Sequence, residues 1–494
     1  MLSILVGHSY FLRLDQKQWE RGKPYPPLAT LQVAANLRDL GHRVSLFDAM
    51  LADGVDDYAG RLQATRPEVV VLYEDNFNYL TKMCLGRMRE AACRMIAIAR
   101  ADGARVIVAG SDASDVPETY LAAGAHAVLL GEGLSALLEL VDRLDTDLGI
   151  EPQRWVGGIT GVASLVNGQI HAARAGALLP VSQSLGLAAW DLLDIERYRS
   201  MWQQRHGYFS LNMAASRGCS FRCNWCAKPI WGNRYRQRSA QDVAVEMSYL
   251  KRMFKPDHIW LADDIFGFRV DWVTEFAERV KAVDAAVPFT IQTRADLISQ
   301  RMASALQAAG CTEVWLGAES GSQRVLDAMN KGTRVGELIA ARAQLREVGI
   351  RVGFFIQLGY LGEDLDDLLA TRDLVTRAMP DEIGVSVSYP LPGTPFYEQV
   401  KAQLGDKTHW QESNDLAMMF RGTYDSDFYR RFRDLLHEQV ASQHRSANAA
   451  LDRSWDALIA CEHLHRTEAA AIPFTPVAQT DAQSDAQSEA QSEA

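Results

Sequence analysis

Short runs rich in β-branched residues alternate with amphipathic helical stretches along most of this 494-residue chain. The alternation predicts α/β domains, in which helices cover parallel sheets. It falls into two series. The first series lies in 1–145, and its expected strands are 4–6, 44–47, 69–72, 106–109 and 127–130. The second lies in 206–400, and its expected strands are 211–214, 258–262, 289–292, 313–316, 351–357 and 382–388.

The first series predicts a doubly wound, Rossmann-like sheet. Its helices include 28–40, ended by Gly41, and 85–100, ended near Gly103. Such sheets bind ligands beyond the carboxyl ends of their strands. Because no GxGxxG follows the first strand, a dinucleotide is disfavoured as the ligand.

The second series predicts a partial (β/α)6 barrel, open where a full barrel would have two more repeats, with functional groups at the strands' carboxyl ends. Residues 146–205 are expected to form a linker with a hairpin turned at Asn167 and Gly168. Residues 401–470 are expected to be helical. Residues 480–494 repeat DAQS and EAQS, and we expect 471–494 to be a disordered acidic tail.

Composition removes several functional classes. The formal charge of −11 gives no electrostatic support for binding nucleic acid. No apolar run of about 20 residues is present to span a bilayer. The chain opens on an expected strand instead of a basic segment followed by an apolar one, so a cytoplasmic protein is expected.

Cys219, Cys223 and Cys226 stand in a CxxxCxxC spacing directly after an expected strand. Three thiolates so close in sequence can converge on one centre, and an iron–sulfur cluster is the centre that thiolates favour. A [4Fe-4S] cube normally takes four thiolates, so three leave one iron open for another ligand. Structural zinc is the alternative. It would need a fourth Cys or His in a paired spacing, which the neighbouring sequence lacks.

The CxxxCxxC spacing, with aromatic Trp225 before the last cysteine, resembles the signature of the radical S-adenosylmethionine (SAM) superfamily. The resemblance covers 211–400. It implies that the open iron chelates the amino and carboxylate groups of SAM, and that Trp225 packs near the adenine. Packing of Trp225 in the core remains the alternative.

Later motifs are similar to those of the same family. Asp263 and Asp264 end the second barrel strand, Arg294 ends the third, and Glu319 ends the fourth before Asn330-Lys331-Gly332. The match implies that Arg294 and Glu319 contact SAM, the arginine through its carboxylate. A salt bridge across the barrel mouth is the alternative for each. The loop 359–363 departs from the family pattern because it lacks the usual proline before Gly-Glu.

The first domain resembles the cobalamin-binding domain of one radical SAM branch, through its first helix and through Gly131-Glu132-Gly133. The DxHxxG motif that supplies a histidine to cobalt in many cobalamin proteins is absent. His8 and His126 are the nearby imidazoles, and for each a structural role is weighed against cobalt ligation. A sheet that has lost its cofactor and only shapes the substrate entrance is a further alternative.

This resemblance implies C-methylation of an unactivated carbon through a 5′-deoxyadenosyl radical, with methylcobalamin as methyl donor and a flavodoxin or ferredoxin as electron donor. An anaerobic oxidative cyclase like those acting on magnesium-protoporphyrin monomethyl ester, or a radical rearrangement enzyme, remains an alternative. A non-catalytic iron–sulfur or cobalamin sensor is the alternative from another class. Aromatic residues in 401–468 either line a pocket for a large apolar or planar substrate or belong to the helical core.

Overall fold

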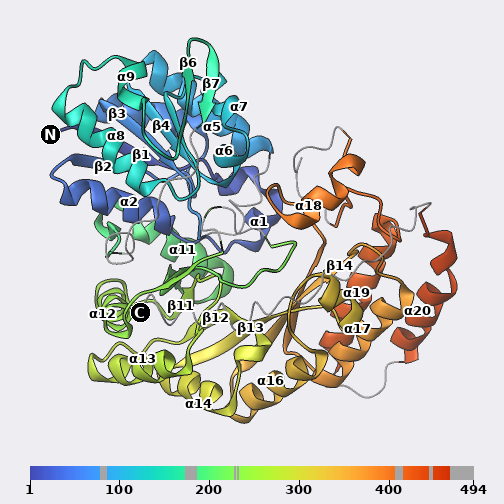
Figure 1. Ribbon diagram of the computed structural model, residues 1–494. Helices are drawn as coiled ribbons and strands as arrows, with labels where there is room; N and C mark the ends of the chain where they lie inside the picture. The colour runs from blue at the N-terminus through green and yellow to red at the C-terminus, as the bar shows by residue number, and fades with distance from the viewer. Residues whose placement is uncertain are drawn as a thin grey trace.

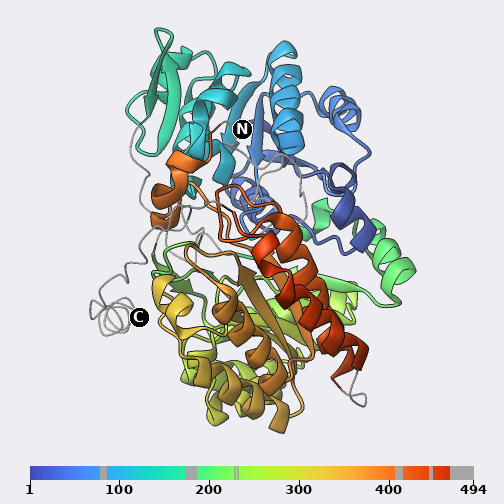
Figure 2. The same ribbon diagram turned by 90° about the vertical axis from the view of Figure 1, so that its right-hand side faces the viewer.

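The computed structural model describes residues 1–77, 86–172, 186–226, 230, 233–405, 416–443 and 449–467. Two sheets with their helices are stacked one on the other, as both views of the molecule show (Figure 1, Figure 2). The expected disordered tail, 471–494, lies outside the described residues.

The first sheet has seven strands in the order β2-β1-β3-β4-β5-β6-β7. Its strands are β1 (Ser3–Gly7), β2 (Arg43–Phe47), β3 (Val69–Tyr73), β4 (Arg105–Ala109), β5 (Ala127–Leu129), β6 (Val162–Val166) and β7 (Gln169–Ala172). The first five strands pair in parallel, at the positions expected from the sequence. β6 and β7 join antiparallel at the β5 edge, so the predicted hairpin extends the first sheet instead of forming part of a separate linker.

Helices cover both faces of this sheet, and β1 to β5 are buried almost throughout because a parallel sheet lies between two helical layers (Figure 1). The helices of this part are α1 (Gln16–Arg21), α2 (Leu28–Asp39), α3 (Val55–Thr65), α5 (Gly86–Ala101), α6 (Ser111–Asp115), α7 (Pro117–Ala122), α8 (Leu134–Thr146) and α9 (Pro152–Val156). The strand order reverses between β1 and β3, and in doubly wound sheets the ligand crevice lies at that reversal.

The second sheet has six parallel strands in the order β15-β14-β13-β12-β11-β8. Its strands are β8 (Ser210–Met213), β11 (His258–Leu261), β12 (Phe289–Thr293), β13 (Cys311–Glu319), β14 (Arg351–Leu358) and β15 (Glu382–Val387). Strands and crossovers follow one another in chain order, which is the order of a barrel left open between its first and last strands. A two-stranded antiparallel ribbon, β9 (Ser216–Gly218) with β10 (Tyr235–Gln237), flanks the cysteine loop.

One face of this second sheet is packed with helices, and the other is partly open. Along β13 the residues Val314, Leu316 and Ala318 are buried, whereas the alternating Glu313, Trp315 and Gly317 are only half-buried. The helices of this part are α12 (Ala240–Phe254), α13 (Val270–Ala282), α14 (Gln300–Ala309), α15 (Gln323–Ala328), α16 (Val335–Glu347), α17 (Leu365–Ala378) and α18 (Pro395–Val400). We call the partly open face the inner face.

Both edges of the second sheet are covered by other parts of the chain. At the β8 edge, the Tyr25 hydroxyl lies 3.1 Å from Ser210 Oγ, and Asn212 Nδ2 donates to the Pro26 carbonyl at 3.0 Å. At the β15 edge lies α19 (Ser426–Ser442). Covered edges present no unpaired backbone to another chain.

The described C-terminal residues include α19 followed by α20 (Ala449–Ala460), and α11 (Ile195–His206) connects the two sheets. Phe428, Tyr429 and Phe432 of α19 are buried, as is the preceding Tyr424, so these aromatic residues belong to the core. Trp410 lies outside the described residues. Within the described ranges, we find no helix with the length and apolarity that crossing a membrane requires.

Candidate functional site

The three clustered cysteines lie in a loop between β9 and β10, beside the carboxyl ends of the barrel strands. Cys219 follows β9 directly, and Cys223 and Cys226 follow it in a turn in which the Cys226 amide donates to the Cys223 carbonyl at 3.4 Å. All three are reduced and half-buried. The loop therefore places three thiols at the end of the sheet where β/α proteins carry their chemistry.

Asn224 anchors this cysteine loop to the sheet. Its Nδ2 donates to the Ala328 carbonyl at 2.6 Å and lies 2.9 Å from the Tyr360 hydroxyl. Its backbone amide donates to the Met329 carbonyl at 3.0 Å, and its own carbonyl accepts from the Phe396 amide at 3.0 Å. Asn224 is buried, so these contacts hold the loop rigidly between its second and third cysteines. Its position between two cysteines is the only local signal for this role in the sequence.

Arg294 lies beside the cysteines at the carboxyl end of β12. Its guanidinium pairs in a bidentate manner with Asp296, with both N–O distances 2.9 Å, and its Nη1 lies 3.8 Å from Cys223 Sγ. Its Cζ is 3.7 Å from the centre of the Phe221 ring. Burial by itself lowers the pKa of Arg294, but Asp296 and the cysteines raise it above its ordinary value. The arginine thus supplies a fixed positive charge next to the thiols.

Glu319 forms a buried ion pair with Lys331, whose Nζ donates to Glu319 Oε1 at 2.7 Å. Glu319 has a positive φ of 59°, and the pairing with β14 shifts register between Gly317 and Glu319. Burial lowers the pKa of Lys331, but Glu319 and Cys223 raise it more, so the net shift is upward. A second cation is thereby held near the cysteines, and the sequence indicated Lys331 only as part of a motif.

Trp225 packs against an apolar cluster that includes Met329, Tyr360 and Phe396. Within the described residues its buried indole Nε1 has no hydrogen-bond partner. The ring is thus placed next to the third cysteine with one polar atom available to a ligand.

The donor set fits an iron–sulfur cluster better than a single metal ion. No group of three His, Cys, Asp or Glu side chains in the described ranges is arranged to hold one metal ion. A cube carries one thiolate on each iron and does not require the sulfurs to meet at a point. Arg294 and Lys331 offset the negative charge that three thiolates and a cluster would bring.

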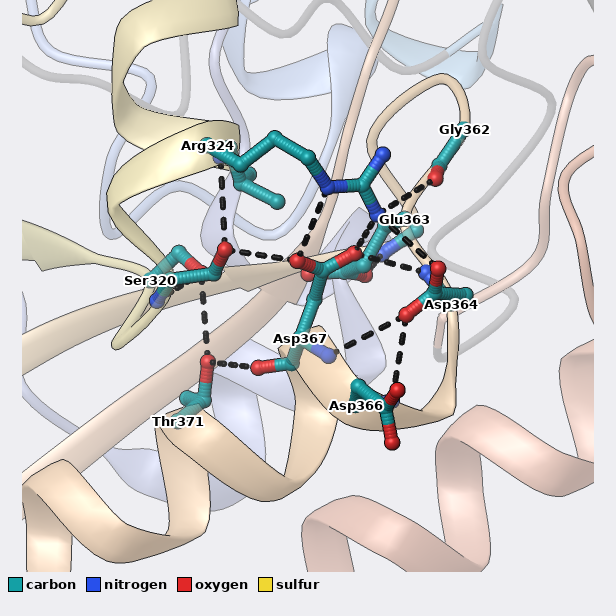
Figure 3. A network of polar contacts seen from close by, with 11 residues as sticks. Ser320, Arg324, Gly362, Glu363, Asp364, Asp366, Asp367 and Thr371 are labelled. Atoms are coloured by element: carbon teal, nitrogen blue, oxygen red, sulfur yellow. Dashed lines mark hydrogen bonds and ion pairs between the residues drawn. The ribbon is translucent and has the colours of Figure 1, made fainter.

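A polar network joins the loop after β13 to the start of α17 (Figure 3). Arg324 pairs with Asp364 and Asp367, and Ser322 Oγ donates to Asp367 Oδ1 at 2.6 Å. The Gly321 amide donates to Thr371 Oγ1 at 2.9 Å. These bonds fix the backbone that follows Glu319, and hence the position of the Glu319–Lys331 pair.

The carboxyl end of the first sheet carries one of the two histidines singled out in the sequence. His8 follows β1 and is buried; its Nε2 accepts from the Ala49 amide at 3.1 Å and lies 3.1 Å from Asp48 Oδ1. Its Nδ1 is buried without a hydrogen-bond partner among the described residues. His126 precedes β5 and therefore lies at the amino ends of the strands, where its Nδ1 accepts from the Val106 amide at 2.9 Å. His126 therefore does not lie at the carboxyl end of the first sheet, where such sheets bind ligands.

Arg217 connects the carboxyl end of the first sheet to the cysteine loop. It lies in β9, two residues before Cys219, and is buried. Its guanidinium forms an ion pair with Glu132, in the loop after β5, and Nη2 donates to Gln32 Oε1 of α2 at 2.8 Å. The carboxyl end of the first sheet thus faces the cysteine loop. No local sequence pattern marks Arg217 for this role, because its partner lies 85 residues away.

The fold and this site define an α/β protein that carries a cysteine-rich centre at the carboxyl end of an open parallel sheet. Residues 213–375 match the sequence model of the Radical SAM superfamily. This part of the chain is therefore a radical SAM domain, and enzymes with such a domain use SAM together with a [4Fe-4S] cluster.

Two relatives illustrate the range of similar sequences. An uncharacterized methyltransferase of Pyrococcus horikoshii is 25% identical over 382 residues, which span 76% of this chain and 79% of that protein. The anaerobic magnesium-protoporphyrin IX monomethyl ester cyclase of Rubrivivax gelatinosus is 26% identical over 290 residues, 57% of this chain and 49% of that protein.

Two solved structures share the fold. The radical SAM methyltransferase TsrM from Kitasatospora setae, solved with cobalamin and a [4Fe-4S] cluster bound, superposes with a TM-score of 0.65 and 18% identity over 82% of this chain and 76% of that one. The cobalamin-dependent radical enzyme OxsB, solved with aqua-cobalamin and SAM bound, gives a TM-score of 0.68 and 17% identity over 94% of this chain and 71% of that one. At these identities the similarity is one of fold.

Proposed function

We propose that this radical SAM enzyme binds cobalamin and methylates an unactivated carbon of a small molecule. The observation that carries the proposal is the Arg217–Glu132 pair, which turns the ligand edge of the first sheet toward the cysteine loop. Cofactors held at the carboxyl end of the first sheet and at the cysteine loop would face each other. The P. horikoshii relative is named a methyltransferase, and the two structural neighbours bind cobalamin.

In this proposal Cys219, Cys223 and Cys226 hold the cluster, while Trp225, Arg294 and Glu319 lie around SAM. When bound, the cluster supplies an electron that splits SAM to give a 5′-deoxyadenosyl radical, and methylcobalamin supplies the methyl group. Arg294 and Lys331 place two positive charges beside the cysteines, where they offset the negative charge that a thiolate-bound cluster would bring. Trp225 offers a ring face and an unpaired indole N–H to the adenine side of SAM.

Cobalamin fits the carboxyl end of the first sheet. The strand order reverses there, between β1 and β3, where such sheets form a ligand crevice. The buried His8 Nδ1 has no hydrogen-bond partner among the described residues and is available to a ligand. The loop at Gly131-Glu132-Gly133 lies at the same edge, held by a hydrogen bond of 2.5 Å from the Tyr73 hydroxyl to the Glu132 carbonyl. With the cofactors bound, docking of the first domain on the barrel would shield the reaction from water.

The test needs no knowledge of the substrate. The chain is reconstituted anaerobically with iron, sulfide and hydroxocobalamin, reduced with dithionite or with a flavodoxin system, and given SAM labelled in its methyl group. We expect bound cobalamin to acquire the labelled methyl, and 5′-deoxyadenosine to form at the same time. Mass spectrometry of both products provides the measurement.

Other outcomes point to the alternatives. Deoxyadenosine without any label on cobalamin would contradict methyl transfer and favour an oxidative cyclase or a rearrangement enzyme. A protein that binds both cofactors but forms no deoxyadenosine would be a sensor. The Cys223→Ala variant, loaded with cobalamin in the same way, is the control, and it should make no deoxyadenosine.

A further inference from the structure

Two aromatic rings lie stacked on the inner face of the second sheet. Trp315 of β13 and Phe355 of β14 have ring centres 4.7 Å apart and planes inclined by 28°. Phe355 is 38% exposed, although it lies in the middle of a strand with partners on both sides. The stack therefore ends in a ring whose face is accessible.

Two glycines allow the rings to lie flat against the sheet. A Cβ on Gly353, which pairs with Trp315, would come within 2.5 Å of the indole ring. A Cβ on Gly384, which pairs with Phe355, would lie 3.3 Å from the phenyl ring and 3.4 Å from the indole. Trp315 Nε1 donates to Glu313 Oε1 at 2.6 Å, which fixes the direction of the indole. We call Trp315, Phe355, Gly353 and Gly384 the aromatic shelf.

The aromatic shelf lies beside the ion pair of the candidate SAM site. Phe355 pairs with Gly317, and a Cβ on Gly317 would be 2.7 Å from Lys331 Nζ and 2.8 Å from Glu319 Oε1. Phe355 and the ion pair thus lie at the same level of one face, on neighbouring strands, with Trp315 two residues further toward the amino end. A molecule on the shelf lies within reach of chemistry at the cysteine end.

Two uncharged polar side chains follow the shelf on the same face, toward the carboxyl ends of β14 and β15. Gln357 lies two residues beyond Phe355, and Ser388 lies two residues beyond Ser386, with which Gln357 pairs. Gln357 Oε1 and Ser388 Oγ are buried and have no hydrogen-bond partner within the described part of the chain. A buried acceptor or hydroxyl left unpaired costs free energy, so such groups commonly await a ligand.

We propose that the aromatic shelf is the substrate-binding surface, and that the substrate presents a flat aromatic ring to Phe355 and a neutral N–H or O–H donor to Gln357 and Ser388. A planar ring extends an existing stack, and offset stacking favours it over a saturated ring of equal size. A neutral donor satisfies the two polar groups without bringing an uncompensated charge into a buried place. This substrate class rests on the proposed function.

The probe is 2-naphthol, with decahydro-2-naphthol as the saturated match and 2-methoxynaphthalene as the match that lacks a donor. Titration calorimetry with the full chain, reconstituted with its cluster and SAM, should show 2-naphthol binding about three- to tenfold more tightly than decahydro-2-naphthol. It should also bind about two- to tenfold more tightly than 2-methoxynaphthalene.

Variants assign each preference to its residue. Phe355→Leu keeps an apolar side chain and should abolish the preference for the flat ring. Ser388→Ala should reduce the preference for the donor and leave the ring preference intact. Val245→Ala, an exposed apolar residue of α12, is the control and should change neither preference. Circular dichroism verifies that each variant is folded.

Several results would overturn the proposal. These are equal affinity for the flat and saturated rings, no binding of any probe, or a Phe355→Leu protein that binds 2-naphthol like the parent. Self-association that depends on Phe355 in sedimentation, without probe binding, would assign the shelf to a second copy of this chain. Deoxyadenosine formation and label on cobalamin are measured separately, so failure of the shelf is distinguishable from failure of the proposed methyltransferase.

Discussion

The absence of a side chain at Gly317 leaves room for the Lys331–Glu319 ion pair. Gly317 lies on the inner face under the Lys331–Glu319 pair, and any Cβ there would come closer than van der Waals contact to both charged groups. The two charged side chains hold each other in place, so neither can move away without breaking a buried ion pair. The position of Glu319 near the cysteines therefore depends on the smallest residue of its strand.

We expect Gly317→Ala to displace the ion pair and to lower the rate of reductive SAM cleavage about tenfold or more, because small displacements of positioning groups cost large factors in rate. The rate of 5′-deoxyadenosine formation under dithionite measures this. Gly336→Ala, in α16 where an added Cβ meets nothing within 4 Å, is the matched control and should leave the rate unchanged. An unaffected Gly317→Ala enzyme would show that the ion pair is not part of the site.

Glu363 gives a pH dependence with a defined sign. Burial raises its pKa to about 8, from an ordinary value of 4.5, with Asp367 and Asp364 adding to the shift. The folded state therefore holds this proton more tightly than the unfolded state. Its contribution to stability is fully present below about pH 4.5 and is lost as pH rises toward 8.

We therefore expect wild-type protein to lose stability relative to Glu363→Gln between about pH 5 and about pH 8, by at most about 1.4 kcal/mol per pH unit. Urea unfolding of both proteins across this range measures the difference. Other buried carboxyl groups, such as that of Asp263, are present in both proteins and cancel. A difference independent of pH would mean that Glu363 is charged throughout.

At the scale of elements, the cysteine loop depends on contacts that come from three later segments of the chain. Asn224 contacts Ala328 and Met329 at the end of α15, Tyr360 after β14, and Phe396 at the start of α18. Asn330 Nδ2 adds a bond of 2.9 Å to the Arg222 carbonyl. The protein's own contacts therefore hold the loop, as a preorganised site requires.

Asn224→Ala should lower the iron and sulfide content after reconstitution, because the loop between Cys223 and Cys226 loses its side-chain anchor and the Ala328 carbonyl loses a donor. Ser220→Ala is the matched control in the same loop, since the Ser220 hydroxyl makes no hydrogen bond within the described residues. Iron analysis and the visible absorption of the cluster distinguish the two. Equal iron in both variants would contradict the anchoring role.

The strands of both sheets could be predicted from the sequence, because β-branched runs bounded by turn residues depend on local pattern alone. The cysteine spacing was equally local. The pairing of Glu319 with Lys331 could not be predicted, because it depends on a register shift in β13 and on a positive φ at Glu319. Arg294 was expected to contact SAM, and its guanidinium pairs with Asp296; whether it also contacts SAM stays a prediction.

At the scale of the whole molecule, Arg217 joins two sheets that the sequence presents as separate domains. The guanidinium and the Glu132 carboxylate are both buried, so each would be left as an uncompensated charge without the other. A buried ion pair by itself adds little to the free energy of unfolding. This pair gives specificity to the docking of the first sheet on the cysteine loop.

Arg217→Met or Glu132→Gln alone should therefore destabilise the protein by about 3–5 kcal/mol, whereas the double variant should lose much less. Denaturant unfolding of the three variants completes a double-mutant cycle. Additive losses would show that the two side chains act independently. A double variant that folds but no longer couples cobalamin methylation to deoxyadenosine formation would identify the pair as the joint between the two halves.

The covered edges of the second sheet also impose an order on synthesis. Tyr25 and Pro26, which cover β8, leave the ribosome long before that strand exists, whereas α19, which covers β15, is made after all six strands. A nascent chain that has just completed β15 therefore has a covered edge at β8 and an uncovered edge at β15. During that interval the growing sheet is open to strand addition from another chain, and the arrival of α19 closes it.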